Sequence, residues 1–294
     1  MLLNNRAADY SASRTTLTSS ADPAGINQGI TYTATVTNPS GGTVTGMITF
    51  QDGGATIATV PLANNQAAYS TSYIQHQIGG HTITAAYSGD AANNFSSATL
   101  TEFIRGWSTV VLTTSGSPSF VGQPVTFTAT VTSKFGAIPD GELVTFYDGK
   151  TALASVALAG GTAAYTTSSL SARTHAIKAA YVGDNTFAPS AKTVSQVVEK
   201  YSTTTTLTSS PNPSNFGQAV TFTAHVKSAG PSAPTGKVKF LDGTTGIASV
   251  TLSGGVAKLT KSMLAVGTHA ITAEYLGDAA SATSTSSVLN QVVQ

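Results

Sequence analysis

The feature that most constrains this 294-residue chain is an internal repeat with a period of about 95 residues. Two sequence blocks carry it, and each occurs three times. They read TYTATVT at 31–37, TFTATVT at 126–132 and TFTAHVK at 221–227, then HTITAAYSGD at 81–90, HAIKAAYVGD at 175–184 and HAITAEYLGD at 269–278. Because two unrelated blocks keep nearly the same spacing, the chain consists of three copies of one domain.

Within each copy, apolar residues alternate with threonine. Tyr32, Ala34 and Val36 share one face of the first block and the threonines share the other, a period of two that indicates a half-buried strand. Similar segments, separated by glycine-rich turns, bring the expected number to about seven strands per copy, and no helical periodicity of useful length is present. This pattern predicts an all-β fold, with three tandem immunoglobulin-like seven-stranded β-sandwiches in an elongated array.

The alternation also predicts the core. Aromatic residues recur at matched inward positions in the three copies. We expect six of them to be buried: Phe50, Tyr87, Phe146, Tyr181, Phe240 and Tyr275.

The repeat also sets the expected domain boundaries. We expect domains over residues 13–105, 106–200 and 201–294, with residues 1–12 as an N-terminal extension or the remnant of a preceding repeat. The linkers between copies are short, so neighbouring domains should touch. Tyr10-Ser11 is expected to precede the first copy as Trp107-Ser108 and Tyr201-Ser202 precede the others.

Composition excludes several classes of function. Charged residues make up only 9% of the chain, while 48 Thr and 34 Ser supply hydroxyl groups. The formal net charge of +1 creates no field that would attract nucleic acid. The absence of cysteine rules out disulfides, thiolate metal sites and cysteine nucleophiles. No apolar run is long enough for a membrane span.

The histidines are the first candidates for chemistry. His81, His175 and His269 occupy one repeat position on the core-facing side of a strand. A catalytic group has no reason to recur in three separate domains with the same apolar neighbours, so a structural role is expected. No nucleophile constellation, phosphate loop or metal cluster accompanies them, and we expect no enzyme and no cofactor.

The repeated aspartates fall into two sets. Asp52, Asp148 and Asp242 precede a glycine in a turn, where we expect the carboxylate to bind nearby backbone N–H groups. The second set, which ends the HTITAAYSGD-type block, lies near an expected domain junction and comprises Asp90, Asp184 and Asp278. Turn capping is expected there too, with calcium binding as the alternative, since calcium needs six to eight oxygen ligands and each loop offers one repeated acid.

These motifs resemble bacterial immunoglobulin-like repeats of the group 3 type. The resemblance covers about residues 13–293 and rests on the Thr-rich first strand, Gly-Gln at 122–123 and 217–218, Phe-x-Asp-Gly, and Gly-x-His-x-Ile-x-Ala-x-Tyr-x-Gly-Asp. The first copy departs from it with Asn27-Gln28-Gly29, and the third lacks the phenylalanine found after Gly-Asp at Phe95 and Phe187. The resemblance implies spacers and display arms of large surface and secreted proteins.

The leading hypothesis is therefore an extracellular or cell-surface bacterial stalk or adhesive spacer. The alternative is a filament subunit assembled by strand addition or end-to-end domain contacts, in which residues 1–12 would pair with another domain. The expected partners are other copies of the chain or neighbouring repeats, with a protein or glycan surface ligand as a further candidate. Neither nucleic acid nor a membrane span is expected.

Overall fold

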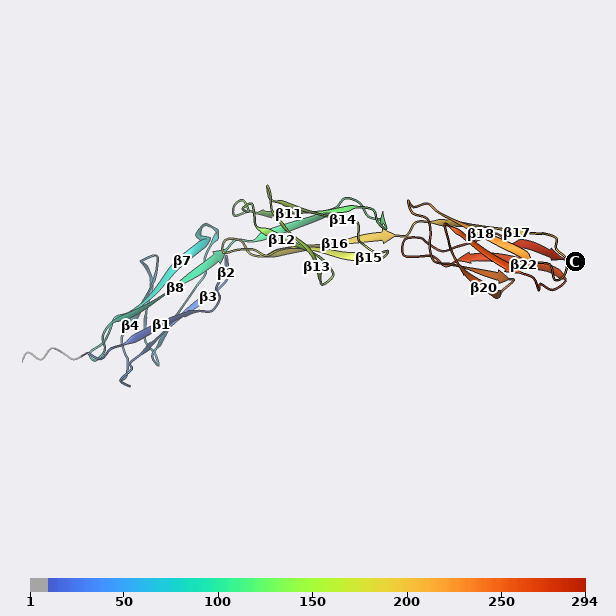
Figure 1. Ribbon diagram of the computed structural model, residues 1–294. Helices are drawn as coiled ribbons and strands as arrows, with labels where there is room; N and C mark the ends of the chain where they lie inside the picture. Colours follow the sequence, from blue (N-terminus) through green and yellow to red (C-terminus); the bar gives the residue numbers. More distant parts are fainter. Residues whose placement is uncertain (1–9) are drawn as a thin grey trace, which may run out of the picture.

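The computed structural model describes residues 10–294 and places them in three β-sandwiches that lie end to end (Figure 1). Each sandwich is built from one copy of the repeat, and the first is inclined to the line of the other two. The predicted all-β, elongated array is confirmed. The expected pairing of residues 1–12 with another domain falls mostly on residues 1–9, which lie outside the described part of the chain.

The first sandwich consists of a three-stranded sheet facing a five-stranded sheet. The three-stranded sheet has the order β1 (Arg14–Ser19), β3 (Ile30–Thr37), β6 (Gln66–Thr71). The five-stranded sheet has the order β2 (Ala24–Gly25), β8 (Ser96–Arg105), β7 (Gly79–Tyr87), β4 (Met47–Asp52), β5 (Ala55–Pro61). A single 3₁₀ turn, η1 (Gln75–Gln77), precedes β7.

The second sandwich repeats this arrangement. Its three-stranded sheet contains β9 (Ser108–Thr114), β11 (Val125–Ser133) and β14 (Thr162–Thr167). Its five-stranded sheet has the order β10 (Ser119–Phe120), β16 (Ser190–Glu199), β15 (Thr174–Tyr181), β12 (Leu143–Asp148), β13 (Thr151–Ala157).

The third sandwich differs in its last strand, which is interrupted, and in the short parallel strand, which is reduced to a single bridge. One sheet contains β17 (Thr203–Ser210), β18 (Val220–Ser228) and β21 (Val256–Lys261). The other contains β20 (Thr245–Thr251), β19 (Lys237–Asp242), β22 (Gly267–Tyr275), β23 (Ser284–Thr285) and β24 (Leu289–Val293). Both β23 and β24 pair with β22. Ser286 lies between them, bonds the backbone of Ala273 and interrupts the regular pairing.

The opening strand of each copy is divided between the two sheets. In the first domain β1 pairs with β3 antiparallel, and the chain then crosses to the opposite sheet, where β2 pairs with β8 in parallel. In the second domain β10 and β16 pair in the same way, and in the third a parallel bridge joins Ser214 to Val293. The seven long strands were predicted. The two-residue strand after the crossing was not, because two residues carry no periodicity.

The crossing ends in a turn that explains the apparent sequence departure at 27–29. Asn27 adopts φ +59°, and Gly122 and Gly217 adopt φ +80° at the same position. Asparagine tolerates this left-handed conformation better than most residues. The next residue in each copy is a glutamine whose side-chain oxygen accepts a backbone N–H three residues back. Asn27-Gln28 therefore replaces Gly-Gln without changing the turn.

The alternation places the core between the two sheets of each sandwich. All six predicted aromatic residues are at most 2% exposed, which confirms the predicted burial. In the first domain the ring of Phe50 lies 6.0 Å from that of Tyr69 on the opposite sheet, and Phe146 and Tyr165 repeat the contact at 5.7 Å. The cores of the copies are thus built on the same plan.

Truncation of one of these rings should destabilise one domain strongly. We expect Phe146→Ala to lower the unfolding free energy of the second domain by about 3–5 kcal/mol, because it removes a fully buried aromatic side chain. Val111→Ala on β9 is the control, since Val111 is 52% exposed, and it should cost under about 0.5 kcal/mol. Calorimetry of the whole chain measures both, and a similar loss for the two variants would contradict the strand register.

Candidate functional site

The segment that leads into each sandwich is bound to a loop of that same sandwich. The backbone N–H of Ser11 donates to the carbonyl oxygen of Ala92 (2.8 Å), and the N–H of Asn94 donates to that of Ser11 (2.9 Å). Gly106 and Tyr201 make the same two bonds in their own domains. We call each such pair of bonds a linker stitch. It fixes where the chain enters the downstream domain.

The linker stitches correct the expected alignment of the linkers. They place Ser11, Gly106 and Tyr201 at one structural position. Tyr10, Trp107 and Tyr201 therefore occupy three different positions, so the predicted equivalence of Tyr10-Ser11, Trp107-Ser108 and Tyr201-Ser202 is wrong. The loop phenylalanines are not equivalent either. Phe187 is buried at the position of Asn93, whereas Phe95 is 82% exposed two residues further on.

The loop that receives the linker is organised by the aspartate after glycine. Oδ1 of Asp90 accepts the N–H groups of Ala92 and Asn93 at 2.8 and 2.7 Å, while Oδ2 accepts the N–H and hydroxyl of Thr45. Asp184 and Asp278 cap their own loops in the same way. The expected turn capping is confirmed at these positions.

These bonds hold two of the carboxylates ionised. Hydrogen bonds from the backbone of Thr45 and Ala92 hold the pKa of Asp90 well below its usual range. Burial opposes ionisation of Asp278, but the N–H and hydroxyl of Thr235 and the N–H groups of its own loop outweigh it and lower its pKa too. Both carboxylates therefore keep the charge that binds these N–H groups.

Calcium binding at Asp90, Asp184 and Asp278 is the alternative to turn capping, and the structure does not test it. Over residues 10–294, no three His, Cys, Asp or Glu side chains converge as metal ligands. The carboxylate oxygens instead accept backbone N–H groups. Hydrogen bonds within the protein therefore hold each loop.

Removal of metal should leave the protein unchanged. We expect EDTA not to shift the melting temperature, because N–H groups of the protein already bind an oxygen of each aspartate. Differential scanning calorimetry in EDTA, then with excess calcium, measures this. A fall of more than a few degrees that calcium restores would contradict it and identify the aspartates as ligands.

The first junction is packed around one glycine. Gly106 is buried, and a Cβ atom there would lie 2.9 Å from the side chain of Phe135 and 3.0 Å from Cδ1 of Ile78. Ile78 belongs to the first domain and Phe135 to the second. The ring of Phe135 packs against the hydrophobic cores of both domains. Ser133 donates its hydroxyl to the carbonyl oxygen of Trp107. Side chains of both domains therefore pack against the linker.

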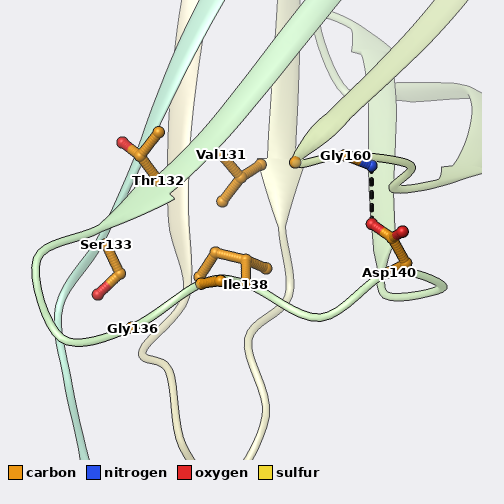
Figure 2. A pocket seen from close by; sticks show the side chains of 9 residues that line it. Val131, Thr132, Ser133, Gly136, Ile138, Asp140 and Gly160 are labelled. Carbon is orange, nitrogen blue, oxygen red and sulfur yellow. Dashed lines mark hydrogen bonds between the residues drawn. The ribbon is translucent and has the colours of Figure 1, made fainter.

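The loop that carries Phe135 is itself fixed to the second domain. A hollow lies where this loop leaves β11, and Figure 2 shows the residues that line it, with Val131 and Ile138 facing each other across its middle. Ile138 is buried, and the carboxylate of Asp140 accepts the N–H of Gly160 at 2.7 Å. The hollow has an apolar wall, and the Asp140 carboxylate beside it already accepts a hydrogen bond. We therefore assign these residues to holding the loop in place.

The second junction uses different side chains in the same place. The rings of Phe120, in β10 of the second domain, and Tyr201, in the linker, are stacked with centroids 4.8 Å apart. Gly230 of the third domain leaves room for the Tyr201 ring, since a Cβ there would lie 2.5 Å from it. Lys200 donates to the carbonyl oxygen of Asp278. A cavity lined by residues of both domains, Val121 and Tyr201 among them, remains beside the linker.

The three repeated histidines pair with the other set of aspartates. Nδ1 of His81 lies 2.8 Å from Oδ2 of Asp52, and Nε2 lies 2.8 Å from the carbonyl oxygen of Gln77. His175 and His269 have the same two contacts. The expectation that the first aspartate set caps its own turn is wrong, because these carboxylates bind the histidine of a neighbouring strand.

Both ring nitrogens of each histidine face an oxygen atom of the same domain. In the third domain, hydrogen bonds raise the pKa of His269. The bond to the backbone carbonyl of Ala265 has the larger effect, and the bond to the Asp242 carboxylate the smaller. Each histidine ties the segment before its strand to the turn after a neighbouring strand, which is the structural role expected from the sequence.

A buried polar side chain lies across from each histidine. Glu102, Gln196 and Gln291 are the cross-strand partners of the three histidines, and all are fully buried. Nε2 of Gln196 donates to the carbonyl oxygens of Gly116 and Val197 and to the hydroxyl of Ser119. Gln291 makes the matching bonds. In these two copies the amide holds the crossing of the opening strand.

The first copy lacks this amide. Glu102 has no N–H to donate, and the matching hydroxyl acceptor is replaced by Ala24. Ser19 donates to Oε2 at 2.5 Å, while Oε1 is buried without a partner. Burial raises the pKa of Glu102. The crossing of the first domain therefore depends on a carboxyl group that is best accommodated when protonated.

Glu102→Gln should stabilise the first domain at pH 7 by about 1–3 kcal/mol, because it removes an unsatisfied buried group and restores the amide. The pKa of Glu102 in the folded state lies above its unfolded value of about 4.3. The wild-type domain therefore loses stability as the pH rises from the unfolded pKa through the folded pKa, because ionisation of the buried carboxyl is unfavourable. Calorimetry from pH 4 to 8 measures this loss, which the variant should lack. An unchanged pH slope would contradict the assignment.

One family model matches three segments of the chain. The sequence model described as "Bacterial Ig-like domain (group 3)" matches residues 17–104, 112–199 and 207–294. No curated protein matches the chain.

Among solved structures, a three-domain I-band fragment of titin matches at 12% identity and a TM-score of 0.39, over 95% of this chain and 98% of that one. FdeC, an Escherichia coli adhesin, matches at 15% identity and a TM-score of 0.30, over 95% and 96%. Within the part of the chain that the structure describes, no helix is both long and apolar enough to cross a membrane.

Proposed function

Because the chain belongs to the bacterial Ig-like domain (group 3) family, we propose that it is a non-enzymatic stalk or adhesive spacer outside the bacterial cell. The observation that carries this proposal is the position of the points at which the chain enters and leaves each domain. The chain enters at one pole and leaves at the other, so a pull on the ends loads the first and last strands directly.

Those two strands are parallel where they meet. In the second domain β10 pairs with β16, and the N–H of Val121 donates to the carbonyl oxygen of Glu199 at 3.0 Å. Opposite pulls on parallel neighbours slide one past the other, so the bonds between them share the load instead of opening one by one. The linker stitch at Gly106 adds two further backbone bonds near the entrance. This geometry supports a load-bearing role.

The polar clusters support a non-enzymatic role. Both nitrogens of each repeated histidine face acceptors of the same domain, which leaves neither free for a substrate. The carboxylate of Asp90 is likewise occupied by its own loop. These groups hold segments of the fold together, and any surface ligand, a protein or a glycan, would bind elsewhere on the rod.

The alternative function is a filament subunit joined by strand addition or by end-to-end domain contacts. One observation favours the end-to-end form. Apolar side chains are exposed at both poles of the rod, among them Phe95 at one end and Phe216 at the other.

Single-molecule force spectroscopy tests the load-bearing role. We expect three unfolding peaks per chain, each releasing roughly 300 Å of extended chain. Val121→Pro should lower the unfolding force of one domain, because proline cannot donate the bond to Glu199. Val121→Ala keeps that N–H and is the matched control.

Unfolding without a measurable force, or an equal effect of the two variants, would contradict the load-bearing role. Antibody labelling of intact cells tests the location separately. Labelling only after lysis would contradict an extracellular spacer.

A further inference from the structure

We propose that a hollow beside the first linker binds a glycan through a sugar ring that carries a carboxylate. The inference rests on the proposed role outside the cell, and it names a ligand class and a site on the rod. The hollow has a volume of about 600 Å³, and we call it the Trp107 hollow. Its lining consists of Trp107, Thr109, Thr132, Ser133, Lys134 and Phe135.

The indole of Trp107 is held in place although it is 59% exposed. The carbonyl oxygen of this residue accepts the hydroxyl of Ser133 at 2.8 Å. The far edge of the ring lies beside Gly25 of the first domain, where a Cβ atom would be 3.8 Å from it. Sugar rings present a face of C–H groups, which packs on the electron-rich face of an aromatic ring. An exposed ring with fixed ends is suited to that contact.

The third domain shows that the fold forms this hollow without an aromatic ring. Strand pairing aligns Thr109 and Thr132 with Thr204 and Lys227, and the last two line a hollow of about 210 Å³. Ser202 and Ala229 stand there at the positions of Trp107 and Lys134. The indole and the ammonium group of the Trp107 hollow are therefore additions to a cavity that the fold makes in their absence.

The polar groups around the indole indicate the kind of sugar. Thr109 and Thr132 lie opposite each other in the pair of β9 and β11, and both are exposed. Their hydroxyls can donate and accept hydrogen bonds, as sugar hydroxyls do. Among the six lining residues, all in the described part of the chain, only Lys134 is charged. Its ammonium group attracts a carboxylate and repels a cation. This combination favours a uronic or sialic acid.

The fluorescence of Trp107 reports on the site directly, because it is the only tryptophan in the chain. Titration of the whole chain with sialyllactose tests a sialic acid, and titration with a hyaluronan tetrasaccharide tests a uronic acid. Lactose is the neutral control that lacks only the sialic acid. We expect a saturable change in emission with at least one acidic sugar, which should bind about two- to fivefold more tightly than lactose, as for an exposed ion pair.

Substitutions separate the ammonium group from the ring. Lys134→Gln should reduce the affinity for the acidic sugar to that for lactose, whereas Lys134→Arg should retain it. Lys192→Gln, at an exposed position on β16 in the other sheet, is the matched control and should have no effect. Trp107→Ser, the side chain present at position 202 in the third copy, should abolish binding. Saturation-transfer NMR of the sugar protons measures this variant, which has no tryptophan fluorescence.

Three results would each overturn the proposal: no saturable response to any of the sugars, lactose binding as tightly as both acidic sugars, or an unchanged affinity in Lys134→Gln. Binding of a glutamate-rich peptide in place of the sugars would also overturn it and would indicate a protein ligand. None of these results alters the force spectroscopy or the antibody labelling. Failure of the sugar site and failure of the stalk role are therefore distinguishable.

Discussion

The crossing of the opening strand from one sheet to the other is the constraint on which the rest of the structure depends. It places the first segment of each domain beside the last strand and parallel to it. Entrance and exit then lie at opposite poles, which makes a tandem array a rod. A single buried side chain, Gln196 in the second copy, holds that crossing by its amide. This amide supports a crossing that main-chain bonds to the last strand also hold.

The sequence predicted the long strands and the core because both rest on a local signal. Alternation of Tyr32, Ala34 and Val36 with threonine specifies which face is buried, and the structure agrees. The polar contacts were harder, since Asp52 and His81 are 29 residues apart and meet only after the strands have paired. The buried Glu102, Gln196 and Gln291 left a usable signal, namely a polar residue at one matched position in all three closing strands.

The junctions could not be aligned from residue types. Tyr10, Trp107 and Tyr201 are aromatic and lie near the linkers, yet the backbone bonds place them at successive rather than equivalent positions. Loops of unequal length shift the spacing between copies by a residue or two, so similar side chains come to occupy different positions. The backbone bonds keep their positions, because Ser11, Gly106 and Tyr201 each make the same two hydrogen bonds to the loop of their own domain.

This difference between backbone and side chains explains how copies with different surfaces form one continuous rod. Entrance and exit are set by main-chain bonds, which any residue other than proline can make, so they are alike in every copy. Side chains only fill the space that remains, with Phe135 at the first junction and the stacked Phe120 and Tyr201 at the second. A junction can therefore change its side chains while the chain enters and leaves each sandwich at the same place. The angle between neighbouring sandwiches is not fixed by those bonds, since the first sandwich is inclined to the line of the other two (Figure 1).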